Sequence, residues 1–270
     1  MDYTVTEALA RSCSQRHNRK ERLMTFGKIG ARKMMNTAWI NPYVKDGLVA
    51  MWDGIWNVGG GLPHDSNSQV WLDCIAGRPI LFPCSNTYFT TDGLVKDSTP
   101  NASGSVIGVS VGSETNFGWT SCEFVITVSS FTGTASPIIM DIGNRKMWLQ
   151  QATSGIGALN VGKPWTFPSI DFSTLPVKFS FSAIYGGESS SDFNSQLIYA
   201  NGNDNGTQDG NRDTWGNISV KTNMMANMYN GVVAYPFYGT YHAIRLYNKT
   251  LTSAEVAANH AVDRERFGLI

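Results

Sequence analysis

The chain has 270 residues, of which 42% are hydrophobic and only 16% carry a charge, and its formal net charge is zero. This length is sufficient for a sizeable core, and so low a charge with 27 glycines is typical of many short strands rather than long helices. No apolar run approaches the roughly 18 residues that cross a membrane, so we exclude a spanning segment and expect no membrane partner.

The N-terminal part of the chain is basic. Residues 1–35 hold eight Lys or Arg against three Asp or Glu, and the remainder holds thirteen against eighteen. We predict a basic arm over residues 1–43, with an amphipathic helix possible within residues 2–24. Nucleic acid is not an expected partner, because Glu21 interrupts the basic run and charged tails often serve solubility alone. We expect the arm to contact other subunits of a larger particle.

The start of the arm does not resemble a signal peptide. Thr4 to Cys13 is polar and is followed by charged residues, unlike the apolar core of a signal peptide. We therefore expect a protein that is made in the cytoplasm and reaches a virion or an extracellular surface by another route.

From Asp46 onward the hydrophobic pattern predicts strands. Val177 to Ala183 alternates strictly, which places Val177, Phe179, Phe181 and Ala183 inward and Lys178, Ser180 and Ser182 outward. Glu123 to Val128 has a similar pattern, and the segments 106–111 and 138–142 are shorter apolar runs bounded by Gly or Pro. We predict an all-β body over residues 44–270.

A C-terminal helix is well signalled. Thr252 followed three residues later by Glu255 forms a capping box, in which each side chain bonds to the other residue's backbone amide. Alanine-rich sequence propagates the helix, and Gly268 marks its end. We expect this helix to be structural.

Two segments carry a family resemblance. The segment Asp46 to Asp53 reads DGLVAMWD, and Tyr241 to Glu255 reads YHAIRLYNKTLTSAE. They resemble the opening and the ending of laminin-G-like, concanavalin A-like jelly-roll domains of the kind found in bacteriophage and gut-bacterial surface proteins. The resemblance implies an all-β, two-sheet antiparallel jelly-roll sandwich in which the two segments are neighbouring first and last strands.

The jelly-roll class includes laminarinase-like hydrolases, which use an E-x-D-x-x-E strand to place a nucleophile and an acid about 5 Å apart. None of the seven Glu residues has Asp two positions later. Serine-hydrolase, zinc-protease and phosphate-binding motifs are also missing. We therefore expect no enzymatic activity and assign no catalytic residue.

Metal-binding patterns are also missing. The four cysteines (Cys13, Cys74, Cys84 and Cys122) show no zinc spacing, and we favour reduced thiols over a Cys74–Cys84 bridge. The four histidines (His17, His64, His242 and His260) form no credible set, and we interpret them as structural. We assign no metal ligand and no cofactor.

Residues 201–215, NGNDNGTQDGNRDTW, form the most polar segment of the body and are expected to be a surface loop. Asn201, Asn203 and Asn205-Gly206 imitate the start of a calcium loop, but Arg212 occupies the position of its bidentate Glu, so calcium is the weaker alternative. Sugars bind to planar aromatic rings and to Asn, Asp and Arg groups. The residues we predict to contact a ligand are Trp215, Asp209, Asn211, Asp213, Trp119 and Trp165.

The sequence thus favours a non-enzymatic carbohydrate-binding or adhesion module. We expect it to be a fibre or capsid-decoration component of a phage-like particle, to contact cell-surface glycans, and to form a homo-oligomer. A purely structural virion subunit without a glycan ligand is the first alternative, and a glycoside hydrolase is the second.

Overall fold

The computed structural model describes residues 42–57, 64–81, 87–97, 107–110, 120–130, 138–142, 145–151, 156–160, 164–185, 195–209, 221–224, 227–229, 232–234 and 238–270. Residues 1–41 of the predicted arm lie outside these ranges. The arm, its partners and the boundary at residue 43 therefore stay predictions.

The described strands form two eight-stranded sheets and a two-stranded ribbon, and every pairing is antiparallel. The first sheet runs β14 (Asn203–Asp209), β13 (Ser195–Ala200), β12 (Val177–Tyr185), β7 (Ser121–Ser130), β18 (Tyr238–Tyr247), β5 (Leu94–Lys96) and β4 (Thr87–Phe89), with β1 (Leu48–Asp53) also on β18. The second runs β11 (Pro164–Asp171), β10 (Ile156–Asn160), β9 (Arg145–Gln151), β8 (Ile138–Ile142), β15 (Lys221–Met224), β6 (Ile107–Ser110), β3 (Pro79–Leu81) and β2 (Val70–Leu72). The ribbon is β16 (Asn227–Tyr229) with β17 (Val232–Ala234). The predicted all-β, two-sheet antiparallel sandwich with a C-terminal helix, α2 (Ser253–Phe267), is confirmed.

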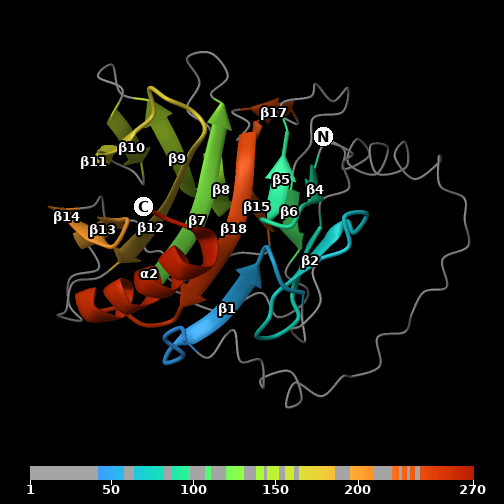
Figure 1. Ribbon diagram of the computed structural model, residues 1–270, viewed down its shortest axis with the longest axis horizontal. Coiled ribbons are helices and arrows are strands. Elements are labelled where there is room, and N and C mark those ends of the chain that lie inside the picture. Colours follow the sequence, from blue (N-terminus) through green and yellow to red (C-terminus); the bar gives the residue numbers. More distant parts are fainter. Residues whose placement is uncertain are drawn as a thin grey trace, which may run out of the picture.

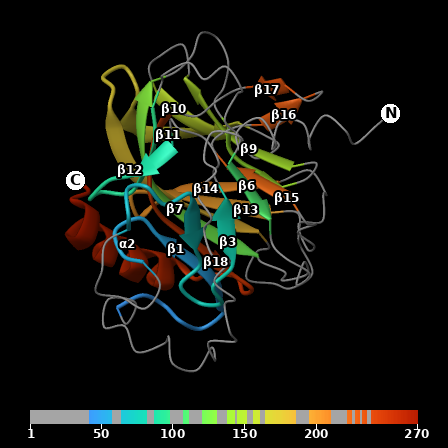
Figure 2. The ribbon, with the colours of Figure 1, turned by 90° about the vertical axis from the view of Figure 1, so that its right-hand side faces the viewer.

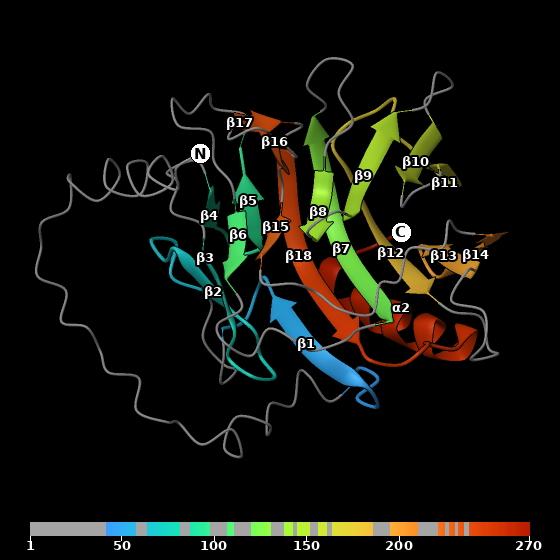
Figure 3. The same ribbon diagram turned by 180° about the vertical axis from the view of Figure 1, so that it is seen from behind.

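Strand β18 organises the first sheet. One of its edges pairs with β7, and the other pairs with β5 at its beginning and with β1 toward its end. Figures 1 and 3 show β7 and β18 side by side through the middle of the molecule, with β12 beyond β7. In the β1–β18 register Leu48 lies opposite Tyr247 and Asp53 opposite Ala243, so the two segments that carry the family resemblance are neighbours, as predicted.

The core lies between the two sheets. Trp71 and Ile80 from the second sheet pack in one cluster with Trp52, Phe124 and Phe181 from the first, and all five are at most 1% exposed. The stacked rings of Phe124 and Phe181, with centroids 4.9 Å apart, join neighbouring strands across this face. Burial of such large apolar side chains is the main stabilising term of the sandwich.

Helix α2 packs against the outer face of the first sheet. In Figure 2 it lies on the opposite side of β1 and β7 from β6 and β15. The capping box predicted from Thr252 and Glu255 is present with both of its bonds, and Gly268 closes the helix at φ 65°. Phe267 then packs with Val125 and Ala243, whose side chains point away from the main core.

This helix changes the expected exposure of β12. Phe179, Phe181 and Ala183 face the core as predicted, but Ser180 and Ser182 on the opposite face are also buried, at 6% exposed each. The two serines point away from the core, as predicted, but α2 covers this face, so the serines are not exposed to solvent. The hydroxyl of Ser182 bonds to Glu123, and that of Ser180 to His260 of the helix.

A buried ion network joins α2 to the sheet. Arg245 of β18, 1% exposed, donates from Nε to Glu123 of β7 at 2.8 Å and from Nη1 to Asp263 of α2 at 2.9 Å. Its Nη2 donates to the second Asp263 oxygen, so this contact is bidentate. Burial raises the pKa of Glu123, whereas Arg245 beside it acts in the opposite direction.

The network also holds the segment that precedes β1. The Tyr43 hydroxyl donates to Asp263 at 2.8 Å, and the Arg245 guanidinium lies 4.3 Å from the centre of the Tyr43 ring. Asn259 of α2 donates to Glu123 and accepts from the Val44 amide. One set of bonds therefore fixes β7, β18, α2 and the entry to β1.

We predict that Arg245→Met lowers the free energy of unfolding by about 3–5 kcal/mol, because Glu123 and Asp263 stay buried without their cation. Lys249→Met is the control: this lysine pairs with Asp46 and Glu255 at the surface, and its loss should cost less than about 1 kcal/mol. Urea denaturation followed by tryptophan fluorescence measures both. Equal losses in the two variants would contradict the role assigned to Arg245.

Candidate functional site

The hairpin that joins β13 to β14 forms one wall of the candidate site. Asn201 and Gly202 form its two-residue turn with positive φ angles of 48° and 73°, which an Asn-Gly pair adopts readily. The expectation of a polar loop over residues 201–215 was therefore wrong in its first part, because Asn203–Asp209 form strand β14. The missed signal was Asn-Gly directly after the apolar run Leu197 to Ala200.

Ser180 holds this turn in place. Its backbone amide donates to Asn201 Oδ1 at 3.0 Å, and its backbone carbonyl accepts from the Asn201 amide at 2.9 Å. Its hydroxyl lies 2.9 Å from His260 Nδ1 of α2. A single residue of β12 thus connects the hairpin turn to the helix.

Gly202 allows the turn to lie directly under His260. A Cβ atom on Gly202 would lie 2.6 Å from His260 Cδ2, which is shorter than side chains tolerate. The positive φ angle independently favours glycine. Glycine at position 202 therefore allows the turn and the helix to lie in close contact.

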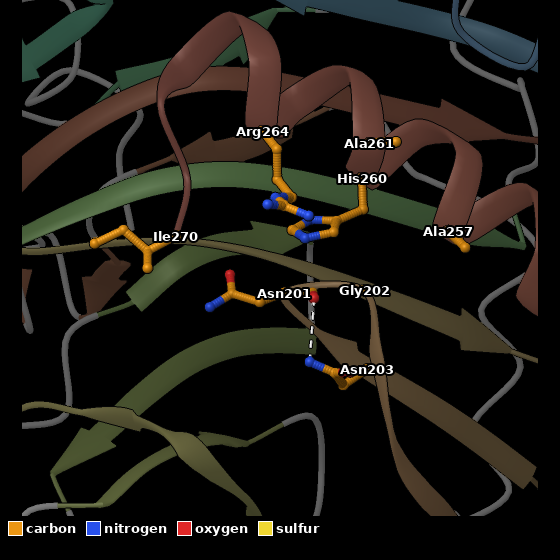
Figure 4. Close-up of a pocket in the computed structure, with 8 residues that line it drawn as sticks. All are labelled: Asn201, Gly202, Asn203, Ala257, His260, Ala261, Arg264 and Ile270. Atoms are coloured by element: carbon orange, nitrogen blue, oxygen red, sulfur yellow. Dashed lines mark hydrogen bonds between the residues drawn. The ribbon is translucent and has the colours of Figure 1, made fainter.

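An open pocket of about 500 Å³ lies between the turn and the helix. Its lining residues are Asn201, Gly202, Asn203, Ala257, His260, Ala261, Arg264 and Ile270. Figure 4 shows His260 and Arg264 pointing from α2 toward the turn, with Asn201 and Asn203 opposite them. The pocket therefore combines amide, imidazole and guanidinium groups with small apolar side chains.

The electrostatics of the pocket depend on Arg264. Partial burial lowers the pKa of His260, and the nearby Arg264 and Arg245 act in the same direction while Asp263 opposes them. His260 is therefore neutral at pH 7, and Arg264 supplies the positive charge of the lining side chains.

The ligand residues predicted from the sequence are only partly placed. Trp119, Asn211, Asp213 and Trp215 lie outside the described residues. Asp209 is the last residue of β14 and Trp165 belongs to β11, which are edge strands of the two sheets and contact each other. The backbone thus brings Asp209 and Trp165 to one edge of the sandwich, and that edge begins at the pocket with Asn203. Sequence reasoning missed His260 and Arg264, because nothing in a helix sequence shows which sheet element it will face.

The start of the imitated calcium loop is folded as part of the β13–β14 hairpin. The alternate positions of Asn203 and Asn205 belong to a strand, and the side-chain oxygen of Asn201 is bonded to the Ser180 amide. Among the described residues, no group of three or more His, Cys, Asp or Glu side chains is placed to hold a metal ion. In the same part of the chain, no helix is long and apolar enough to span a membrane.

Two other histidines and two cysteines are buried in the framework. His242 bonds to the Asp92 carbonyl and to the Thr127 hydroxyl, and His64 bonds to the Asp53 carbonyl and stacks on Phe89. Both are structural, as predicted. The thiols of Cys74 and Cys122 are free and buried, whereas Cys13 and Cys84 lie outside the described residues.

The comparison with solved structures supports the fold. No protein-family model and no curated protein matches the sequence. Trypanosoma rangeli sialidase in complex with sialic acid is similar over 81% of this chain and 33% of its own, at TM-score 0.54 and 16% identity. The same sialidase in complex with 2,3-difluorosialic acid, a covalent intermediate, is similar over 97% of this chain and 39% of its own, at TM-score 0.56 and 14% identity. This chain thus spans between a third and two fifths of those proteins, and the likeness shows a shared β-sandwich fold.

The expectation that the chain is not an enzyme is contradicted by these neighbours, because sialidases are enzymes. That expectation rested mainly on the missing E-x-D-x-x-E motif, which places two catalytic carboxylates on one strand. Sialidases are exceptions to that chemistry, since their nucleophile is a tyrosine. The missing E-x-D-x-x-E motif therefore argues against one class of hydrolase and not against hydrolysis in general.

We predict that Gly202→Ala destabilises the protein by about 3 kcal/mol, because strain at positive φ adds to the overlap with His260. Gly77→Ala is the matched control: φ is 71° there, but nothing lies within 4 Å of the added Cβ, so about 1 kcal/mol of strain is expected. Thermal and urea unfolding of both variants measure the difference. A loss no larger for Gly202→Ala would mean that the turn does not press against the helix.

We predict that the protein loses stability in mild acid and that part of this loss depends on His242. Burial lowers the pKa of His242 to about 4 from its ordinary 6.5, with the Asp92 carbonyl acting in the opposite direction. The stabilising effect of the neutral ring is complete above pH 6.5 and decreases toward pH 4, so about 2 kcal/mol is lost between pH 7.5 and pH 5. Urea unfolding at the two pH values should show a smaller change in His242→Gln, and parallel changes would contradict this assignment.

Proposed function

We propose that this chain binds carbohydrate and that the pocket between the β13–β14 turn and α2 holds one sugar unit. The observation that carries the proposal is the convergence of the Asn201 amide, the His260 imidazole and the Arg264 guanidinium on one open pocket of about 500 Å³. Binding pockets for small molecules commonly measure about 300–1,000 Å³ and combine a few convergent polar groups with apolar surface.

The composition of the pocket suits a sugar. The polar groups can bond to hydroxyls, and Ala257, Ala261 and Ile270 offer apolar surface to the C–H faces of a sugar ring. Further sugar units would follow β14 toward Asp209, where we propose contacts with Trp165, Asn211, Asp213, Trp215 and Trp119. The solved sialidase structures with bound sialic acid or its difluoro analogue add support from proteins of similar fold.

We propose further that the protein is a homo-oligomeric component of a phage-like particle and contacts cell-surface glycans. The basic arm, residues 1–43, would attach it to other subunits, which suits the family resemblance of the segments that begin at Asp46 and Tyr241. Removal of residues 1–40 should then leave sugar binding intact and abolish incorporation into the particle. A purely structural subunit would bind no glycan with or without the arm.

We predict that Ala257→Trp weakens glycan binding at least tenfold, because an indole at this exposed helix position fills the pocket without removing any polar group. Ala258→Trp is the matched control, since Ala258 is also exposed but does not line the pocket. A glycan array selects the ligand, and titration calorimetry measures both variants on it. Equal binding by the two variants would place the sugar elsewhere on the protein.

The sialidase neighbours also favour a second function, glycoside hydrolysis. The same preparations should be assayed for release of fluorophore from 4-methylumbelliferyl sialic acid. Release that Ala257→Trp abolishes and Ala258→Trp preserves would make the pocket an active site. Absence of both binding and hydrolysis would leave the structural subunit as the remaining alternative.

A further inference from the structure

Several side chains that line the pocket can donate hydrogen bonds. Arg264 is exposed on the last turns of α2, and its guanidinium forms no ion pair or hydrogen bond with the described residues. Other arginines of the same region behave differently: Arg245 and Arg266 are engaged with Asp263 and with Asp53. Arg264 is thus a cation at the pocket that forms no ion pair with a described Asp or Glu side chain.

The turn supplies a second donor. The backbone amide of Ser180 can only donate, so the Asn201 atom that faces it is the side-chain oxygen. The Asn201 Nδ2 group is then the end that remains without a partner in the described part of the chain. The oxygen and nitrogen of the Asn201 side chain are thus assigned from the bond, because a backbone amide can donate only to the oxygen.

His260 supplies a third polar atom. Its Nδ1 is engaged with the Ser180 hydroxyl, which leaves Nε2 without a protein partner among the described residues. When the Ser180 hydroxyl donates to Nδ1, Nε2 carries the proton and is a donor. The guanidinium and the amide therefore offer hydrogens to one ligand from two walls of the pocket, and the imidazole adds a third donor when the Ser180 hydroxyl donates to Nδ1.

We propose that the pocket selects an acidic sugar, whose carboxylate pairs with Arg264 and accepts from Asn201 or His260. This inference rests on the proposed carbohydrate binding and adds the ligand class. The lining side chains include one full positive charge and no lysine. This single charge matches one carboxylate better than a ligand that carries several phosphate or sulfate groups. The planar guanidinium matches a carboxylate with two parallel bonds.

The expected selectivity is large enough to measure. A hydrogen bond to a charged group changes affinity by roughly 10- to 150-fold. The full chain should therefore bind 3′-sialyllactose at least tenfold more tightly than lactose, which lacks the carboxylate. Inorganic phosphate and acetate at the same concentration should compete poorly, because they offer the charge without the sugar.

The decisive variant is Arg264→Gln, measured by titration calorimetry with both sugars. It should reduce the preference for 3′-sialyllactose over lactose to about twofold or less. Lys45→Gln removes the same formal charge at an exposed position that does not line the pocket, and it should keep the preference. Circular dichroism and melting curves check that the variants are folded.

The outcomes separate this inference from the proposed function. Equal binding of lactose and 3′-sialyllactose by the unmodified chain, or a preference that survives Arg264→Gln, would overturn the acidic-sugar inference and leave sugar binding in place. No binding of any sugar would overturn both. Full displacement by phosphate or acetate would replace the acidic sugar with a simple anion site.

Discussion

The contact between α2 and the first sheet depends on one buried cation. Arg245 pairs with Glu123 on the neighbouring strand and with Asp263 on the helix, and all three side chains are almost completely buried. Such a network is stable only when every member has its partners, so it permits one position of the helix along the sheet. The candidate site inherits this constraint, because His260 lies one turn before Asp263, and Arg264 directly follows it.

The second constraint is the hold of Ser180 on both walls of the pocket. Its backbone bonds to Asn201, and its hydroxyl bonds to His260. One residue of β12 therefore positions both the turn and the helix. Gly202 lets the turn approach the ring closely. Two polar groups of the pocket, those of Asn201 and His260, are therefore held by a strand of the sheet, and such support from a rigid element preorganises a binding site.

The prediction that the chain is not an enzyme failed for a general reason. A fold is a scaffold on which different sites are built, and the sandwich seen here is similar to part of sialidases without sharing more than about a sixth of their residues. A missing motif excludes only the mechanism for which that motif is required. The positive argument for function has to come from the groups that the structure brings together, which are the donors of the pocket.

The sequence by itself determined the local structure and the closure of the sandwich. Strict alternation in β12 fixed its core face, Thr252 and Glu255 fixed the start of α2, and the segments from Asp46 and Tyr241 identified neighbouring strands. These features depend on residues close together in the chain or on a family pattern. Only the tertiary structure decided what covers the outer face of the sheet. The sequence placed Ser180 and Ser182 away from the core, and only the structure shows that α2 covers them. Asn201, His260 and Arg264 line one pocket although about sixty residues separate the asparagine from the other two, and no local pattern predicts this arrangement.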